Sequence, residues 1–211
     1  MNEQRRKTIS NVVRVGLMGG TFDPPHIGHF RVAIEALESL HLNEVKLIPV
    51  NIPSHRSKPI ASPSARVEML TRVAQDPLNV DVCEIQRGGI SFSIDTVKFM
   101  KNKLPNAKFF LIIGLDSFLS FKEWAAWEEL LRLTNLAVFA RDGGDPTLKE
   151  QYLKEFSGYS EENEVIFLDS PILEVGSTEI RNKIKNGLNV DYLLPEKVFG
   201  YIKAEKLYRN D

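Results

Sequence analysis

Cysteine is almost absent from this 211-residue chain, in which Cys83 is the single one. One thiol cannot form an internal disulfide, and no Cys-x-x-Cys pair or Cys/His cluster indicates a zinc site. Long apolar runs are missing too: a stretch such as Phe109 to Ile113 is far short of the roughly 20 residues that a helical membrane span needs. The first ten residues are polar and basic and lack the apolar segment of a secretory signal. We therefore expect a cytoplasmic protein that does not enter a membrane.

The chain also lacks an excess of charge of either sign. Its 27 Lys and Arg stand against 28 Asp and Glu, a formal net charge of -1. A dedicated nucleic-acid binder would usually carry a basic surplus, so no nucleic-acid partner is expected. Apolar residues make up 43 % of the chain, enough to bury a core and to exclude disorder as the dominant state. The length favours one domain over residues 11–211, preceded by a disordered extension over residues 1–10.

Segments typical of strands and helices alternate along the chain, without an internal repeat. The expected strands are Val12 to Met18, Glu44 to Val50, Val80 to Ile85, Lys108 to Ile113, Leu136 to Ala140 and Glu164 to Leu168. The expected helices are Ile27 to Leu40, Arg66 to Ala74, Ser93 to Leu104, Thr147 to Phe156, Ser177 to Asn186 and Pro195 to Glu205, with residues 116–133 helical in parts and loops over 51–62 and 141–146. This alternation predicts an α/β fold with a doubly wound parallel sheet, closed by C-terminal helices. Such sheets bind ligands at the carboxyl ends of their strands.

The exit of the first expected strand carries the first candidate site, in the segment Gly19-Gly-Thr-Phe-Asp-Pro-Pro-His-Ile-Gly-His29. The two glycines let the backbone approach a ligand closely. His26 and His29 share one face at the start of a helix, where unpaired N–H groups and the macrodipole favour an anion. The simpler interpretations are a helix cap, surface histidines or half of a metal site, although no third ligand stands nearby. The segment is neither a Walker loop nor a Gly-x-Gly-x-x-Gly motif.

Gly19 to His29 resembles the signature of the HxGH nucleotidylyltransferases, a Rossmann-like superfamily that transfers a nucleotidyl group from a nucleoside triphosphate. Val175 to Arg181 resembles the second signature of that superfamily, with Gly176 in place of a serine. Ser177 and Thr178 are expected to cap a helix whose N-terminus accepts a phosphate, and Arg181 adds a cation one turn further on. Taken alone, this second segment would read as an ordinary helix cap.

Within the superfamily the chain resembles the bacterial nicotinate-nucleotide adenylyltransferases from Val13 to Tyr208. The matching segments are Asn51 to Arg56, Arg66 to Leu70, Ser91 to Thr96, Ile112 to Asp116, Trp124 with Trp127, Leu193 to Pro195, Val198 to Ile202 and Leu207-Tyr208. Two positions depart from the family pattern: Ser54 replaces a proline, and Phe92-Ser93 stands for Tyr-Thr. The resemblance implies adenylyl transfer from ATP to nicotinate mononucleotide, and a homo-oligomer stays open.

The resemblance also implies the roles of individual residues. The residues implied to be catalytic are His26, His29 and Arg181. ATP would be bound by Gly19, Gly20, Thr21, Phe22, His26, His29, Ser177, Thr178 and Arg181. The mononucleotide would be bound by Phe92, Ser93, Asp116, Trp124 and Arg56. Mg²⁺ would accompany ATP and be held mainly by phosphate oxygens and water, with no metal site made by protein side chains.

Two rival functions stay open at this stage. One is another HxGH nucleotidylyltransferase, such as a phosphopantetheine adenylyltransferase, which the Ile112 to Trp124 region disfavours. The other is a nucleotide-binding module without catalysis, which the intact histidines and Arg181 disfavour. We expect Trp124 to stack on the pyridine ring and Trp127 to be structural, although a lone tryptophan is more often part of a core. Which of the two faces the substrate stays open. The preference between nicotinate and nicotinamide mononucleotide is open.

Overall fold

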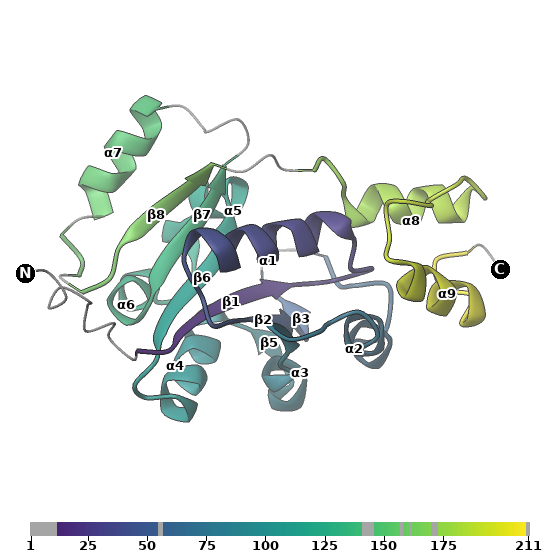
Figure 1. Cartoon of the computed structure of the whole chain (residues 1–211), viewed down its shortest axis with the longest axis horizontal. Helices are drawn as coiled ribbons and strands as arrows, with labels where there is room; N and C mark the ends of the chain where they lie inside the picture. The colour runs from purple at the N-terminus through teal and green to yellow at the C-terminus, as the bar shows by residue number, and fades with distance from the viewer. Residues whose placement is uncertain are drawn as a thin grey trace, which may run out of the picture.

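The structure is a computed structural model that describes residues 12–54, 57–140, 146–156, 158–160, 162–169 and 173–209. The predicted N-terminal extension and nearly all of the predicted 141–146 loop lie outside these ranges. Within them, the α/β fold is as predicted: a parallel sheet with helices on both faces and two helices at the C-terminal end of the chain (Figure 1).

The main sheet has six strands in the order β4-β2-β1-β6-β7-β8, and every neighbouring pair is parallel. The strands are β1 (Arg14–Gly20), β2 (Glu44–Pro49), β4 (Leu78–Val80), β6 (Lys108–Gly114), β7 (Asn135–Ala140) and β8 (Val165–Asp169). Counted along the chain, the spatial order of these strands is 3-2-1-4-5-6, the doubly wound Rossmann-like order. The direction of winding changes between β1 and β6, so the carboxyl ends of these two strands define the switch point.

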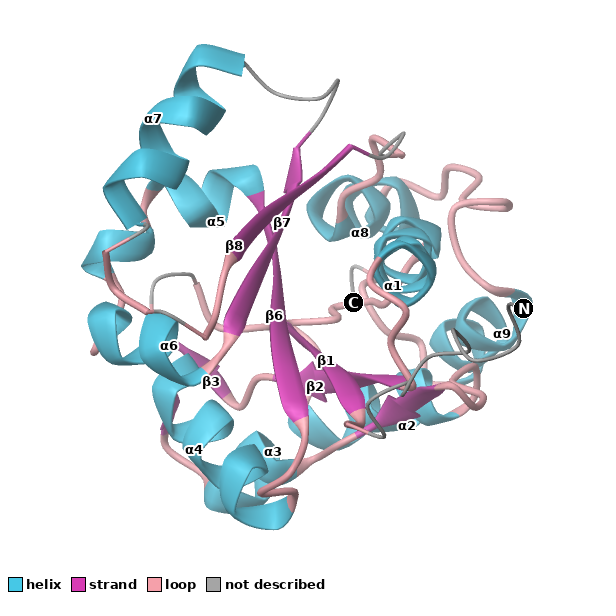
Figure 2. Ribbon diagram, turned by 60° about the vertical axis from the view of Figure 1, so that its left-hand side comes forward, coloured by secondary structure: helices cyan, strands magenta, loops and turns pink. Residues whose placement is uncertain are grey.

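Helices cover both faces of the sheet, as Figure 2 shows for α1 on one side and α4 and α6 on the other. The helical elements are α1 (Ile27–Ser39), α2 (Pro63–Thr71), α3 (Cys83–Arg87), α4 (Ser93–Lys103), α5 (Leu115–Leu119), the 3-10 turn η1 (Phe121–Glu123), α6 (Trp127–Leu133), α7 (Pro146–Phe156), α8 (Ser177–Lys185) and α9 (Glu196–Ala204). Each helix predicted from the sequence overlaps one of these. The hydroxyl of Ser62 caps α2 by accepting the Ala65 amide at 3.2 Å, and Pro63 occupies its first turn, so this helix begins before the expected Arg66.

Side chains alternate across β6 between two separate cores. Phe109, Leu111 and Ile113 pack with α4 to α7 on one face, and Phe110 and Ile112 pack with α1 and β2 on the other. A strand covered on both faces needs such a continuous apolar run, which is why this strand stood out in the sequence. A third core joins α2, α8 and α9 at the end of the molecule opposite α7 (Figure 1).

The predicted strand from Val80 to Ile85 coincides with the observed strand only at Val80 and is wrong from Asp81 onward. The strand β4 ends at Val80, and α3 begins at Cys83. The carboxylate of Asp81 accepts the Cys83 amide at 3.1 Å, a local bond that turns the chain out of the extended conformation. The predicted 51–62 loop also contains a short strand, β3 (Ile52–Pro53), which pairs in parallel with β5 (Ile90–Ser91).

Among the described residues, no helix combines the length and the apolar character that a membrane crossing requires.

Candidate active site

A cleft of about 570 Å³ opens at the switch point between β1 and β6. Doubly wound sheets bind ligands at the carboxyl ends of their strands, and the cleft lies at the carboxyl ends of β1 and β6, which are Gly20 and Gly114. The predicted site residues that line it are Gly19, Gly20, Thr21, His29, Phe92, Ser93, Asp116 and Trp124. Residues from four separate segments that the sequence analysis singled out thus share one cavity.

The two histidines of the first motif form the N-terminus of α1. His26 is the N-cap, and its amide donates to Nδ1 of His29 at 3.2 Å, while the His29 amide donates to the carbonyl of His26 at 3.0 Å. The imidazole centroids are 3.7 Å apart. Because Nδ1 of His29 is an acceptor here, the proton of the neutral ring resides on Nε2. His29, which lines the cleft, is therefore a donor at Nε2.

His26 is held more deeply, with 6 % of its surface exposed, and does not itself line the cleft. Burial lowers the pKa of His26 to about 4, so the ring is neutral near pH 7. Its Nδ1 has no hydrogen-bond partner among the described residues. A Cβ on Gly28 would come within 3.1 Å of that nitrogen, so glycine at this position leaves room for the ring.

Phe22 takes a supporting position. It adopts a left-handed φ of 49° and is fully buried in the core beside α1. Its ring centroid lies 4.9 Å from that of His29. The resemblance implied a contact with ATP, whereas the structure places this side chain behind the histidine and out of the cleft.

The second motif is tied to the first through side-chain hydrogen bonds. The Ser177 hydroxyl donates to the Pro24 carbonyl at 3.0 Å. Nη1 of Arg181 donates to the Asp23 carbonyl at 2.7 Å, and Nη2 donates to the Thr178 hydroxyl at 3.1 Å. These three side chains do not line the cleft, but they lie against the loop that leads into His26. The motif therefore gathers a cation and the N-terminus of α8 next to the N-terminus of α1.

The predicted capping role of Ser177 and Thr178 is wrong. The helix α8 begins at Ser177, its N-cap is Gly176, and no side chain caps it. The hydroxyl of Ser177 is bonded to the Pro24 carbonyl, and that of Thr178 accepts from Arg181. The contact between Ser177 and Pro24 joins segments that are far apart in the chain, so a capping rule based on neighbouring residues could not predict it.

The two tryptophans have different environments. Trp124 lines the cleft and packs against Phe121, with ring centroids 5.3 Å apart. Trp127 does not line it and packs edge-on against Phe156 and Tyr159, at 6.0 and 5.0 Å. An aromatic face for a flat ligand is thus available at Trp124. Arg56, expected near the mononucleotide, lies outside the described residues.

Arg66 is a residue whose importance the sequence did not reveal. It is fully buried, and its Nη1 donates to the Thr21 carbonyl at 2.8 Å while Nη2 donates to the Asn51 carbonyl at 3.4 Å. Its guanidinium thus joins the loops that follow β1 and β2. The resemblance of Arg66 to Leu70 to a helix of the family was the one feature of the sequence that pointed to this residue. Its burial could not be predicted, because arginine is usually exposed.

Glu84 is a second such residue. It lines the cleft, is 4 % exposed and accepts the Thr96 hydroxyl at 2.6 Å through Oε1, whereas Oε2 has no hydrogen-bond partner among the described residues. Burial raises the pKa of Glu84 above its ordinary value. In the sequence Glu84 falls within the strand expected over Val80 to Ile85, and no motif marked it as part of a site.

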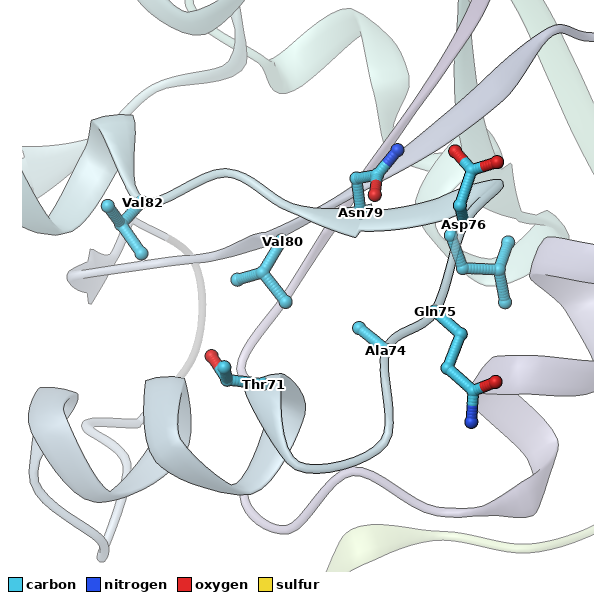
Figure 3. Close-up of a pocket in the computed structure, with 8 residues that line it drawn as sticks. Thr71, Ala74, Gln75, Asp76, Asn79, Val80 and Val82 are labelled. Atoms are coloured by element: carbon cyan, nitrogen blue, oxygen red, sulfur yellow. The ribbon is translucent and has the colours of Figure 1, made fainter.

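No group of three or more His, Cys, Asp or Glu within the described ranges could hold a metal ion. A second hollow of about 300 Å³ lies beside the edge strand β4, between Thr71 at the end of α2 and Val80 and Val82 (Figure 3). The side chains that surround it are mainly small, apolar or amide groups, with Asp76 as the only carboxylate in its lining. It lacks the histidine and the aromatic face that line the cleft at the switch point, which stays the candidate site.

Comparison with known proteins defines first the class and then the family. The cytidylyltransferase-like family model matches residues 17–183, which shows that the chain belongs to that family. A probable nicotinate-nucleotide adenylyltransferase from Hydrogenovibrio crunogenus is 36 % identical over 203 residues, which cover 92 % of this chain and 97 % of the relative. Another from Exiguobacterium sibiricum is 36 % identical, with 93 % and 99 % covered. Within its class, the chain is a member of the nicotinate-nucleotide adenylyltransferase family, as the motifs predicted.

Solved structures agree with this fold. The nicotinic acid mononucleotide adenylyltransferase of Plasmodium falciparum complexed with NaAD superposes with a TM-score of 0.71 at 17 % identity, over 93 % of this chain and 97 % of that one. The same protein complexed with APC gives a TM-score of 0.69. At this identity the likeness confirms the Rossmann-like fold.

Proposed function

We propose that this chain transfers the adenylyl group of ATP to nicotinate mononucleotide, which yields nicotinate adenine dinucleotide and pyrophosphate in NAD biosynthesis. One observation carries the proposal: an imidazole at a helix N-terminus, His29, and an aromatic face, Trp124, line the same cleft at the switch point. The first suits a polyphosphate and the second suits a pyridine ring.

The reaction requires no covalent intermediate with the protein. A phosphate oxygen of the mononucleotide forms a bond to the α-phosphorus of ATP, and the bond from that phosphorus to the bridging oxygen breaks as pyrophosphate leaves. The nucleophile is already an anion at neutral pH, so no general base is needed. Catalysis then depends on holding two anions in line and stabilising the charge on the bridging and leaving oxygens.

At the ATP end, the chain supplies neutral donors and one cation. His29 would donate from Nε2 to a phosphate oxygen. His26 would hold the His29 ring in place and would also contact the triphosphate. The backbone of Gly19, Gly20 and Thr21 would allow close approach of the nucleotide. Ser177, Thr178 and Arg181 would receive the β and γ phosphates, Arg181 through N–H groups other than those bonded to the Asp23 carbonyl and the Thr178 hydroxyl.

At the mononucleotide end, Trp124 would stack on the pyridine ring. Phe92 and Ser93 at the start of α4 form the neighbouring wall, and the exposed Asp116 follows β6, where it can accept a hydrogen bond from a ribose hydroxyl. Arg56 is proposed to attract the phosphate of the mononucleotide.

Mg²⁺ is proposed to accompany ATP. Because the described residues provide no cluster of three ligands, the ion would be held mainly by phosphate oxygens and water. When bound, it would offset part of the charge of the triphosphate and of the leaving pyrophosphate.

The test is pyrophosphate release by the purified chain with ATP and nicotinate mononucleotide together, and with each alone. We expect release only with both substrates, and loss of release in excess EDTA. Turnover with phosphopantetheine in place of the mononucleotide would favour the rival transferase, and ATP binding without turnover would favour a non-catalytic module. Nicotinamide mononucleotide in a parallel reaction measures the preference between the two pyridines.

A further inference from the structure

Asp23 is the centre of a buried hydrogen-bond network that joins the first loop of the chain to its last turn. Its carboxylate is almost fully buried, at 2 % exposure. Oδ1 accepts the Ala61 amide at 3.0 Å and the Tyr208 hydroxyl at 2.7 Å, and Oδ2 accepts the Ile60 amide at 2.7 Å. Since a buried carboxylate is stable only when its oxygens are bonded, these donors determine how the group is turned.

Arg181 depends on the same residue. Its Nη1 lies 2.7 Å from the main-chain oxygen of Asp23 and 3.7 Å from Oδ2, while its Nη2 is bonded to Thr178. The guanidinium is thus bonded to the main chain of Asp23 and also lies within ion-pair distance of its carboxylate. Because Asp23 also begins the Asp-Pro-Pro turn into His26, the network lies between the two signature motifs.

Tyr208 is hydrogen-bonded to Asp23 and is not among the residues that line the cleft. Its ring packs in the core formed by α2, α8 and α9, and 9 % of the residue is exposed. Burial and the charge of Asp23 raise the pKa of Tyr208, so the hydroxyl stays protonated and is a donor. Phenylalanine would fill the same space but would leave Oδ1 of Asp23 with the Ala61 amide alone.

We propose that Tyr208 is a positioning residue for the ATP end of the site. Its hydroxyl holds the Asp23 carboxylate in the orientation that sets Arg181 beside Thr178, so the last turn of the chain helps to place the cation for the triphosphate. The inference rests on the proposed function, because that function assigns Arg181 to ATP.

The first experiment compares Tyr208→Phe with the matched control Tyr201→Phe. Tyr201 belongs to α9, and its ring lies under the Arg72 guanidinium at 4.8 Å, away from Asp23. We expect Tyr208→Phe to raise the KM for ATP by roughly five- to tenfold, a coupling of about 1 to 1.4 kcal/mol. The KM for nicotinate mononucleotide should stay within about twofold, and the control should match the parent. An unchanged KM for ATP, or an equal rise for both substrates, would overturn the proposal.

A double-mutant cycle with Arg181→Ala separates positioning from a purely structural role. If Tyr208 acts through Arg181, Tyr208→Phe has no further effect on ATP once Arg181 is removed, whereas independent effects would add. Calorimetric binding of ATP to the same variants gives this comparison without turnover. A parent protein that binds ATP but releases no pyrophosphate would therefore refute the proposed function and leave the cycle to decide the role of Tyr208.

Discussion

The ability of His29 to donate a hydrogen bond from Nε2 depends on the hydrogen bond that its Nδ1 accepts. The His26 amide occupies Nδ1, so the neutral ring carries its proton on Nε2. We expect His29→Ala to lower kcat by about 10²- to 10³-fold, the usual loss when one preorganised donor to transition-state charge is removed. Steady-state kinetics measures this, with the exposed His41→Ala as control. A folded variant within a few-fold of the parent would contradict the role.

Trp124 and Trp127 provide the residue-level test of substrate binding. Trp124→Ala should weaken nicotinate mononucleotide binding, because it removes an aromatic contact worth about 0.5–1.5 kcal/mol beyond its buried area. ATP affinity and melting temperature should change little. Trp127→Ala should instead destabilise the fold by about 3–5 kcal/mol, because it empties a site between Phe156 and Tyr159. Calorimetric titrations and thermal melts of both variants check this, and the reverse pattern would refute the placement of the pyridine ring.

At the scale of elements, the N-terminus of α1 makes the protein sensitive to acid. The folded chain keeps His26 neutral down to about pH 4, whereas the unfolded chain protonates it near its ordinary pKa of 6.5. Between these values the unfolded state binds more protons, so the free energy of unfolding falls as pH decreases, by up to roughly 3 kcal/mol. Asn is a good N-cap that does not titrate in this range, so His26→Asn should remove this part of the pH dependence.

Urea unfolding at pH 7 and pH 4.5 measures that difference for the parent and for His26→Asn. Groups other than His26 titrate in both proteins and cancel in the comparison. An identical loss of stability in the two proteins would show that His26 is not the group responsible.

Element prediction succeeded where local patterns and tertiary burial agree. The continuous apolar run of β6 is such a local feature, and the strand appears in the structure as predicted. The failure at residues 81–85 is equally local in cause, because one side-chain bond from Asp81 turns the chain out of the extended conformation. The pairing of β3 with β5 was not predictable, because each has two residues and their register depends on distant packing.

At the scale of the whole molecule, the two signature motifs work as one unit although they are far apart in the chain. Arg181→Ala should raise the KM for ATP and leave the KM for nicotinate mononucleotide nearly unchanged, because its proposed phosphate partners belong to ATP alone. Substrate-dependent initial rates measure both constants. Equal losses for both substrates, with a lower melting temperature, would show that the bond to the Asp23 carbonyl has a purely structural role.

The sequence by itself determined the α/β class with a doubly wound parallel sheet, and the family. The first follows from the alternating strand and helix patterns, and the second from motifs that can be recognised in short segments. Only the tertiary structure decided which tryptophan lines the cleft, that Arg66 and Glu84 are buried, and that Asp23 joins Tyr208 to Arg181. The physical reason is that burial and hydrogen-bond partners depend on which distant segments meet, and the energetic cost of an unpaired buried polar group then selects the partners.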